Sequence, residues 1–376
     1  MTAPHATGWR ELLADVPREP FLPDVVWIDG PDRTFLPVSR QRDPQRWADA
    51  TCGDQPVITQ VDDGAPPPGQ PGVVPTSSAS MPTVVAGMLD ALGAEAGHAV
   101  LEVGTGTGWN AALLARRVGP TGRVVSVEVD PALADTARSV LATAGANVDV
   151  ITGDGERGYP DGAPYDRIIA TASVRAIPFA WVQQARTGGV IVTPWGTDYC
   201  NSTLARLVVG PAGVAFGRFR DGYSFMRLRS QRRYLVNPDG TDLDTASAEH
   251  SITDLDGRDV YRMITASEAA FAIGLRLPDC RMLFEEDRRG QRHHTVELHH
   301  SSSGSWALVD VDVDRGRGFD VYQAGARRLW DEAVDAYRWW LAHDTPGVER
   351  FGITITAASQ VVWLNDPASE HHWIVG

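Results

Sequence analysis

The alternation of hydrophobic and polar positions changes twice along the chain and divides it into three regions. Residues 1–75 end in a stretch rich in proline and glycine, 62–72, which predicts a connector or a flexible flap. Residues 76–230 alternate short apolar runs with helical patterns, which predicts a parallel α/β sheet. Residues 231–376 mix strand-like and helical patterns. We therefore expect an N-terminal segment and linker, a central α/β domain and a C-terminal α+β domain.

The middle region carries the clearest pattern. Short apolar runs of strand length predict five buried strands, at 98–103, 123–128, 148–151, 165–170 and 189–193. Amphipathic stretches predict three helices, at 82–92, 109–118 and 131–144. Strands and helices at this rhythm indicate a doubly wound sheet, which binds ligands at the carboxyl ends of its strands.

The C-terminal region contains further strand-like runs and one strong amphipathic helix, 324–343. The predicted strands are 294–299, 306–311, 351–356 and 360–364. Trp339 and Trp340 are neighbours in the helix and cannot both face the same core, so one of them is a candidate for an exposed contact.

Composition excludes some classes of function. The net charge of −14 argues against a protein that holds nucleic acid by neutralising its phosphates. The chain has no run of about 18 apolar residues, so we expect no membrane-spanning helix. Its first residues lack the charged and apolar regions of a signal peptide, which predicts a cytoplasmic protein.

The cysteines and histidines predict no metal site. The three cysteines are far apart in the sequence and form no Cys-x-x-Cys pair. Histidine doublets occur at 293–294, 299–300 and 371–372. Adjacent residues on a strand point to opposite faces, and no cysteine or carboxylate spacing accompanies these doublets.

A glycine-rich loop joins the first predicted strand to the helix that follows it. Gly104, Gly106 and Gly108 allow a tight turn and close approach to a ligand, and the helix start offers unpaired amides. A dinucleotide fingerprint requires glycine at position 109, where Trp109 stands. A nicotinamide-dependent oxidoreductase is therefore the weaker interpretation, and the spacing fits a cofactor lying across the loop.

Two carboxylates follow at the ends of later strands. Glu128 ends the second strand, where it is able to accept both hydroxyls of a ribose, although a solvated strand end has the same pattern. Asp154, between Gly153 and Gly155, is able to accept the amino group of an adenine, although Asp-Gly is also a common turn. The glycine loop and both carboxylates, in this order, form a stronger signal than any of them alone.

Several longer motifs resemble the protein-L-isoaspartate O-methyltransferase family over roughly residues 10–215. They are Val16–Pro23, Val100–Trp109, Gly153–Gly155, Ala163–Ala172 with Ile177-Pro178, and Gly188–Gly196. The resemblance implies a class I methyltransferase fold, which is Rossmann-like. It also implies S-adenosylmethionine as methyl donor, with S-adenosylhomocysteine as product, and a peptide aspartyl-type carboxylate as acceptor.

The resemblance also assigns residues to the site. Ser80 inherits the role of the family's acceptor-contacting serine, with a helix cap before Pro82 as the structural alternative. Thr171 matches a substrate-side threonine. The donor-binding residues implied are Ser78, Glu102, Gly104, Thr105, Gly106, Thr107, Gly108, Asn110, Glu128, Val129, Asp154 and Gly155.

Three departures bear on the acceptor. The loop continues as Trp109-Asn110 instead of the family's usual Tyr-Gln, and Ser78 and Ala79 replace threonine and isoleucine. In addition, roughly 145 C-terminal residues lie outside the common repair enzyme. Extended homologues of this kind resemble methyltransferases that modify an ordinary aspartate in a ribosomally made precursor peptide, such as a lanthipeptide, a lasso peptide or an ATP-grasp-cyclised peptide.

The sequence therefore predicts methylation of an aspartyl carboxylate in a constrained precursor peptide, with the C-terminal domain as a candidate for peptide recognition. General repair of isoaspartate in proteins is the alternative. A binding protein that retains the donor site without catalysis is a third hypothesis. The sequence does not predict the acceptor peptide or the oligomeric state.

Overall fold

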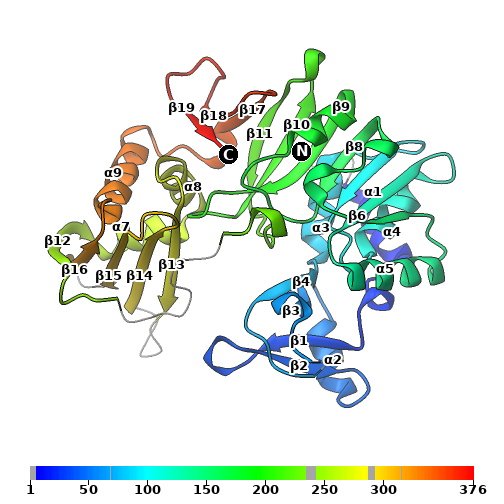
Figure 1. The fold of residues 1–376 in the computed structure, drawn as a ribbon, viewed down its shortest axis with the longest axis horizontal. Coiled ribbons are helices and arrows are strands. Elements are labelled where there is room, and N and C mark those ends of the chain that lie inside the picture. Colours follow the sequence, from blue (N-terminus) through cyan, green and yellow to red (C-terminus); the bar gives the residue numbers. More distant parts are fainter. Residues whose placement is uncertain (1–5, 68, 234–242, 287–292, 315) are drawn as a thin grey trace.

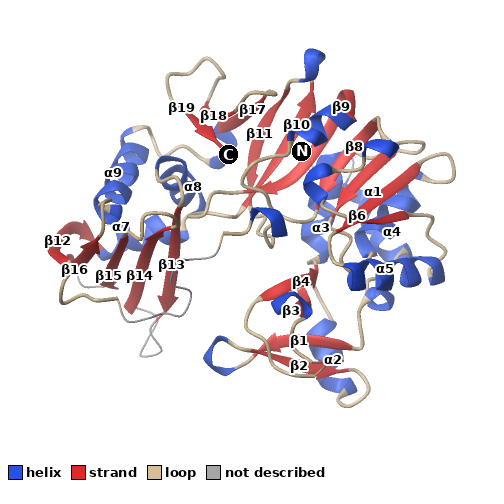
Figure 2. Cartoon of the chain, in the orientation of Figure 1, coloured by secondary structure: helices blue, strands red, loops and turns tan. Residues whose placement is uncertain are grey.

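The computed structural model describes residues 6–67, 69–233, 243–286, 293–314 and 316–376 and arranges them around three β-sheets (Figure 1). A ten-stranded sheet with helices on it forms the centre of the molecule. In the view of Figure 2, a four-stranded sheet lies below it, and a five-stranded sheet with its helices lies to its left.

The N-terminal region forms the four-stranded antiparallel sheet, in the order β2-β1-β3-β4. Its strands are β1 (Val25–Asp29), β2 (Phe35–Ser39), β3 (Val57–Val61) and β4 (Pro75–Ala79). Helix α2 (Pro44–Thr51) packs Trp47 into a small core with Val26 and Val38. This region is thus a folded unit with its own core.

The proline-rich stretch 62–72 connects β3 to β4 inside this sheet. The Asp62 carboxylate accepts hydrogen bonds from the backbone N–H groups of Val73 and Val74, at 2.9 and 2.8 Å. Gly72 and Phe35 exchange backbone hydrogen bonds of 3.0 and 2.7 Å. The stretch predicted as a connector or a flexible flap is therefore a connection between two strands of one sheet, held by hydrogen bonds at its end, and the predicted boundary at residue 75 falls within the sheet.

The central sheet has the order β19-β18-β17-β11-β10-β9-β8-β5-β6-β7. Strands β9, β8, β5, β6 and β7 are parallel, and β10, β11, β17, β18 and β19 are antiparallel to their neighbours. Its first seven strands in the chain are β5 (Ala99–Val103), β6 (Arg123–Glu128), β7 (Asp149–Thr152), β8 (Tyr165–Ala170), β9 (Ala185–Trp195), β10 (Thr203–Val209) and β11 (Ala215–Asp221). The five parallel strands are those that the sequence predicted.

Helices α3 (Pro82–Leu92), α4 (Trp109–Val118), α5 (Pro131–Thr143) and α6 (Phe179–Gln184) pack on the parallel strands, and α1 (Ala6–Asp15) packs on α3 and α4. Local sequence sets their ends: the Asp130 carboxylate caps α5 with Pro131 next to it, and Gly93 ends α3 with a left-handed φ of 61°. The bounds of α3 and α4 are those predicted.

The C-terminal region adds the five-stranded antiparallel sheet, in the order β12-β16-β15-β14-β13. Its strands are β12 (Glu249–Asp256), β13 (Cys280–Glu286), β14 (His293–His300), β15 (Trp306–Asp312) and β16 (Arg317–Ala324). The accompanying helices are α7 (Gly257–Thr265), α8 (Ser267–Arg276) and α9 (Leu329–Ala342).

The last part of the chain leaves this unit and returns to the central sheet. Strand β17 (Phe351–Ile355) pairs with β11, and β18 (Gln360–Leu364) and β19 (His372–Val375) follow it outward. Residues predicted as one C-terminal domain, 231–376, are therefore divided between two sheets. Strands β17 and β18 were predicted from the sequence pattern, whereas β19 and the pairing partners of all three strands were not.

An aromatic cluster joins the central sheet to the C-terminal unit. The rings of Trp195 and Phe219 are 4.9 Å apart, Phe219 lies 5.1 Å from Phe271 of α8, and Phe271 lies 5.1 Å from Phe351 of β17. All four side chains are buried. Because they come from four elements, the C-terminal unit shares a hydrophobic core with the central sheet.

Trp339 and Trp340 face different surroundings, as their adjacency required. Trp340 is buried, whereas Trp339 is half-buried and stacks on His343 at 4.3 Å between ring centres. Trp339 also makes an edge contact with Trp373 of β19, at 5.4 Å. The partly exposed tryptophan therefore serves contact within the chain.

Two features of the described residues bear on other classes of function. No helix in that part of the chain is long and apolar enough to cross a membrane. The same residues contain no group of three or more His, Cys, Asp or Glu side chains placed to hold a metal ion.

Candidate active site

A cavity of about 960 Å³ opens at the carboxyl ends of the parallel strands. Its walls come from the glycine loop, the ends of β6 and β8, the turn after β7, the end of β4 with the start of α3, and the segment 222–232. Strand ends supply the donor-side wall, while the N-terminal sheet and residues after β11 cover it. Twelve of the fourteen residues predicted for the site line this cavity: Ser78, Ser80, Gly104, Thr105, Gly106, Thr107, Asn110, Glu128, Val129, Asp154, Gly155 and Thr171.

The glycine loop adopts a conformation that other residues rarely adopt. Gly104, Gly106 and Gly108 have φ angles of 95°, 52° and 86°, all in the left-handed region. A Cβ atom at Gly104 would lie 2.8 Å from the hydroxyl oxygen of Thr171, which is closer than real contacts of this kind. Gly108 is the N-cap residue of α4 and is not part of the cavity wall, so it shapes the loop from below.

Glu102 lies beneath the loop rather than in the cavity. It is fully buried, accepts a 2.6 Å hydrogen bond from the Asn110 amide and accepts a second hydrogen bond from the Ser126 hydroxyl. Ser126 is also hydrogen-bonded to the Thr105 hydroxyl, at 2.6 Å. Burial raises the pKa of Glu102 to about 7, against the lowering effect of the two hydrogen bonds. The side chain therefore supports the loop from its inner side.

Glu128 has its carboxylate fixed at the end of β6. It accepts hydrogen bonds from the backbone N–H of Gly106 at 2.9 Å and of Asp130 at 3.0 Å. Only 7% of the residue is exposed, although it lines the cavity. Glu128 is therefore not a solvated residue at a strand end, and a carboxylate in this place is available to ribose hydroxyls.

Asp154 and Gly155 lie on the far side of the donor wall. One Asp154 carboxylate oxygen accepts a 3.0 Å hydrogen bond from the backbone N–H of Glu156 and caps a short helical turn. The turn that the sequence allowed as an alternative is thus present. Asp154 also lines the cavity, as do Gly155 and Val129, the residue that follows β6.

Ser80 lies in the cavity wall between β4 and α3. The cap residue of α3 is Met81, which makes no side-chain cap hydrogen bond. Asp54 binds the first turn instead, because its carboxylate accepts hydrogen bonds from the Thr83 backbone N–H at 2.9 Å and the Thr83 hydroxyl at 2.7 Å. The capping alternative for Ser80 therefore does not apply.

Thr171 braces the glycine loop. Its hydroxyl donates to the carbonyl oxygen of Gly104 in a short hydrogen bond, and its backbone N–H donates to Val103 O at 2.9 Å. A threonine hydroxyl has one proton. Because this proton is donated to the carbonyl oxygen of Gly104, the Thr171 hydroxyl stabilises the loop in this structure and has no proton left to donate to an acceptor carboxylate.

The segment 222–232 forms a wall that lies beyond the motifs recognised in the sequence. Leu228 N donates to Ser173 O at 2.9 Å, and Ser173 N donates to Met226 O at 2.8 Å, which holds the segment beside the end of β8. The Arg227 guanidinium donates to the carbonyl oxygens of Gly196 and Thr197, each at 2.9 Å. The segment also carries Arg229 and Arg232, but no sequence motif predicted that it would line the site.

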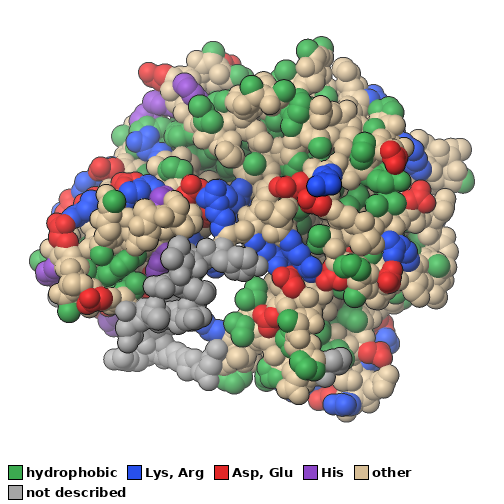
Figure 3. All heavy atoms as spheres, in the orientation of Figure 1, with side chains coloured by type: hydrophobic (Ala, Val, Ile, Leu, Met, Phe, Trp, Pro, Cys, Tyr) green, Lys and Arg blue, Asp and Glu red, His purple; other side chains and the backbone are tan. Residues whose placement is uncertain are grey.

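Arginines and acidic residues alternate where the three folded units meet. Figure 3 shows Arg side chains gathered beside Asp and Glu side chains near the middle of the face in view; the chain has no lysine. Arg175 lies 3.2 Å from a carboxylate oxygen of Asp198 and 3.0 Å from one of Asp279. The ion pairs therefore link the central sheet to the start of β13.

The size and composition of the cavity fit a nucleoside with an amino-acid tail. Cavities of this volume hold molecules of cofactor size. The parallel sheet, the glycine loop after its middle strand and the acidic residue ending the next strand define a class I methyltransferase fold, whose cofactor is S-adenosylmethionine.

The family model of "Protein-L-isoaspartate(D-aspartate) O-methyltransferase" matches residues 70–208. Two curated proteins named protein-L-isoaspartate O-methyltransferase are similar to this chain. That of Pyrococcus abyssi is 41% identical over 150 residues, which are 40% of this chain and 68% of the relative. That of Ignicoccus hospitalis is 43% identical over 135 residues, 36% of this chain and 64% of the relative. The chain belongs to the protein-L-isoaspartate O-methyltransferase family.

The match is partial in both directions. The chain spans about half to two thirds of the length of the curated relatives that it matches. A solved structure also named protein-L-isoaspartate O-methyltransferase superposes on 97% of this chain and 96% of its own, with a TM-score of 0.51 and 20% identity. At that identity the likeness concerns the fold, and it extends to the C-terminal region.

Proposed function

We propose that this enzyme transfers the methyl group of S-adenosylmethionine to the side-chain carboxylate of an aspartyl residue in a constrained precursor peptide. The observation that carries the proposal is the single cavity in which the glycine loop and Glu128 face Ser80 and the segment 222–232. The donor-side wall belongs to the matched family region. Most of the opposite wall, residues 222–232, lies outside it.

The chemistry requires alignment more than acid–base catalysis. An aspartyl carboxylate has a pKa near 4 and is already ionised at neutral pH. One of its oxygens attacks the sulfonium methyl, the carbon–sulfur bond breaks, and the products are a methyl ester and the neutral thioether S-adenosylhomocysteine. Because opposite charges are neutralised, a dry cavity that holds the two groups in line favours the step.

The ester then leads to the rearranged product. The backbone nitrogen of the next residue attacks the ester carbonyl and expels methanol, which gives a succinimide. Water opens this ring to aspartate or isoaspartate. These steps follow from the ester itself, so the enzyme needs to supply only the methyl transfer.

In this proposal Ser80 contacts the acceptor carboxylate, and the donor site consists of the glycine loop with Ser78, Asn110, Glu128, Val129, Asp154 and Gly155. Glu102 and Gly108 support the loop from below, and Thr171 braces it. The C-terminal region does not by itself separate the two candidate acceptors, since a solved protein with the family's name has a counterpart. The wall formed by residues 222–232 is the feature that favours a dedicated peptide.

The test offers labelled S-adenosylmethionine with two acceptors: a linear isoaspartyl peptide and a cyclised peptide with an ordinary aspartate. We expect methylation of the cyclised peptide, followed in the mass spectrum by loss of methanol. Ser80→Ala should lower the rate by about 10- to 100-fold, with unchanged affinity for S-adenosylhomocysteine. Asp54→Asn, which loosens α3 without touching the cavity, is the control for general disturbance of this segment.

Other outcomes would replace the proposal. Methylation of the linear isoaspartyl peptide alone would favour general repair. Tight binding of S-adenosylhomocysteine without transfer to either peptide would favour a binding protein. Affinity for NAD in place of S-adenosylhomocysteine would indicate an oxidoreductase.

A further inference from the structure

Asp130 joins three parts of the chain through its carboxylate. One oxygen accepts hydrogen bonds from the backbone N–H groups of Ala132 and Leu133, at 2.9 and 3.2 Å, and caps α5. The other oxygen accepts from the Gln60 amide of β3 at 3.0 Å and from the Arg229 guanidinium at 2.9 Å. Burial raises the pKa of Asp130, but the hydrogen bonds from Gln60 and Arg229 outweigh it, so the pKa lies below its usual value.

The same residue fixes Glu128. The Asp130 backbone N–H donates to one Glu128 oxygen at 3.0 Å, while Gly106 N–H holds the other at 2.9 Å. The position of the Glu128 carboxylate therefore depends on where the start of α5 lies. The start of α5 is in turn fixed by Gln60 and Arg229, whose side chains donate hydrogen bonds to the Asp130 oxygen that does not cap the helix.

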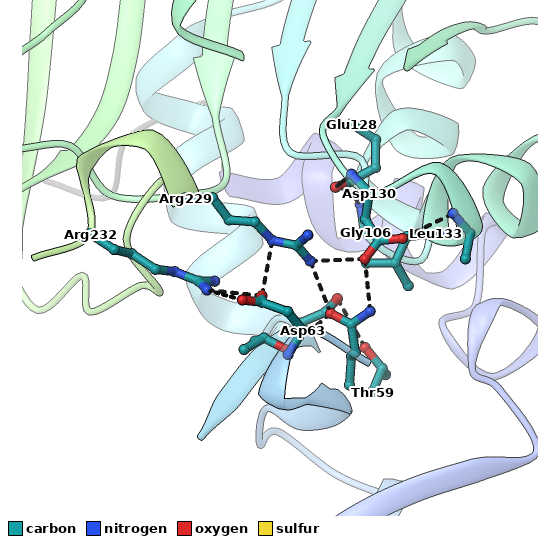
Figure 4. Close-up of polar contacts among 12 residues, drawn as sticks. Thr59, Asp63, Gly106, Glu128, Asp130, Leu133, Arg229 and Arg232 are labelled. Atoms are coloured by element: carbon teal, nitrogen blue, oxygen red, sulfur yellow. Dashed lines mark hydrogen bonds and ion pairs between the residues drawn. The ribbon is translucent and has the colours of Figure 1, made fainter. Parts of the chain in front are cut away.

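Arg229 spans two carboxylates, as Figure 4 shows. Its terminal nitrogen binds Asp130, and its Nε lies 3.0 Å from a carboxylate oxygen of Asp63 on the β3–β4 connection. Arg232 binds both oxygens of Asp63 at 2.9 Å. A planar guanidinium is able to bridge two acceptors in this way, which lysine or glutamine cannot do with the same geometry.

We propose that Arg229 is a positioning residue for the methyl donor, acting through Asp130 to hold the Glu128 carboxylate where it binds the donor ribose. The inference rests on the role of Glu128 in the proposed function. Asp63 is the anchor of Arg229 on the N-terminal sheet and does not itself reach Asp130 or Glu128. The donor site thus depends on a residue that comes about 100 positions after Glu128 and lies beyond the region matched by the family model.

The experiment measures the Kd of S-adenosylhomocysteine by calorimetry on the full chain. Arg229→Gln should raise Kd by about 5- to 10-fold, less than the roughly 10- to 100-fold that follows loss of a group that orients a metal ligand, because the backbone N–H groups of Gly106 and Asp130 still hold Glu128. Arg229→Lys, which keeps one charged contact, should give a smaller increase. Asp63→Asn is the matched control: it removes a contact of both arginines but leaves the bonds of Arg229 and Gln60 to Asp130, so Kd should change less than about twofold.

A kinetic measurement separates positioning from loss of folded protein. With the cyclised peptide as acceptor, Arg229→Gln should raise KM for S-adenosylmethionine, and kcat at saturating donor should be retained. A merely structural defect would lower kcat and the calorimetric stoichiometry together, and that result would overturn the inference. Equal weakening by Asp63→Asn and Arg229→Gln would overturn it as well, because the anchor to the N-terminal sheet would then be the determinant.

Glu128→Ala is the reference that distinguishes the two proposals. If Glu128→Ala leaves Kd unchanged, the donor site described under the proposed function is wrong. If Glu128→Ala weakens binding and Arg229→Gln does not, the donor site stands and the role of Arg229 is rejected.

Discussion

Glu102, a single buried side chain below the glycine loop, makes the stability of the folded protein depend on pH. Its carboxyl group is fully buried and bonded to Asn110 and Ser126, and burial raises its pKa to about 7. Protonation of Glu102 therefore stabilises the folded protein. Its contribution is fully present below the ordinary value of 4.5 and is lost as the pH rises through about 7.

Glu102→Gln removes this titration and keeps a side chain of the same shape. We expect the free energy of unfolding of the unchanged protein to fall relative to that of Glu102→Gln between about pH 5 and pH 8, by a few kcal/mol. Urea denaturation at several pH values measures the difference. A difference that stays constant over this range would show that Glu102 does not titrate there.

The residues proposed for the donor side could be named from the sequence because most of them stand at a strand end within a few positions of a glycine or a turn. The contacts that fix them were not predictable. Gln60 and Asp130 are 70 positions apart, and Asp130 and Arg229 are 99 apart. Such contacts depend on the packing of separate units, and no local pattern in the sequence marks them. The hydrogen bond of Thr171 to Gly104 was hidden for the same reason.

Among the elements, the turn before β1 fixes the wall that carries Ser80. The buried guanidinium of Arg18 donates to the carbonyl oxygens of Gln55 at 2.7 Å and Ser80 at 3.1 Å. It also donates to those of Thr51 and Gly53, at 3.0 and 3.2 Å. Burial lowers the pKa of Arg18, partly offset by Asp54. The motif that resembles the family's N-terminal signature, Val16–Pro23, therefore fixes the backbone of the segment that carries Ser80.

Arg18→Met should lower the free energy of unfolding by about 2–4 kcal/mol, because it leaves four carbonyl groups without their donor in a buried place. Urea denaturation checks this value. Arg40→Met is the matched control, since Arg40 is an exposed arginine paired with Glu19 at 2.6 Å, and its loss should cost no more than about 1 kcal/mol. Equal effects of the two substitutions would contradict a special role for Arg18.

Element bounds were predictable where local signals agree with packing. Helix α4 starts after the glycine loop and α5 after its Asp130-Pro131 start, as the sequence indicated. The helix predicted from 324 begins at Leu329, because Ala324 ends β16 and Gly325 adopts a φ of 97°. The four strands of the N-terminal sheet were missed, since Pro37 and Pro75 interrupt the patterns that would have marked β2 and β4.

At the scale of the whole molecule, two segments of the chain contribute to units that other parts of the sequence form. The N-terminal sheet covers the donor site that later strands form, and the final strands extend the sheet that the middle region begins (Figure 1). The predicted division into 1–75, 76–230 and 231–376 was based on the sequence pattern. The hydrophobic core is instead determined by which strands pair with one another, and strands from different regions pair. We therefore propose that 231–376 is not a separable domain and that its last 30 residues belong with the methyltransferase sheet.

Removal of residues 346–376 tests this view. The shortened chain loses β17, which covers the edge of β11, and Phe351 of the aromatic cluster. The buried hydrophobic side chains lost are Val348, Phe351, Ile353, Ile355, Val362, Trp363 and Leu364. At about 1.5–3 kcal/mol each, their burial is comparable to the whole stability of a domain, so we expect aggregation or a large fall in Tm, with loss of binding to S-adenosylhomocysteine.

Circular dichroism during heating measures Tm, and size-exclusion chromatography measures aggregation. The control is Ile374→Ser, at a residue 78% exposed on β19, which should change neither. A shortened chain with native Tm and donor affinity would mean that the final strands are an independent addition to the sheet.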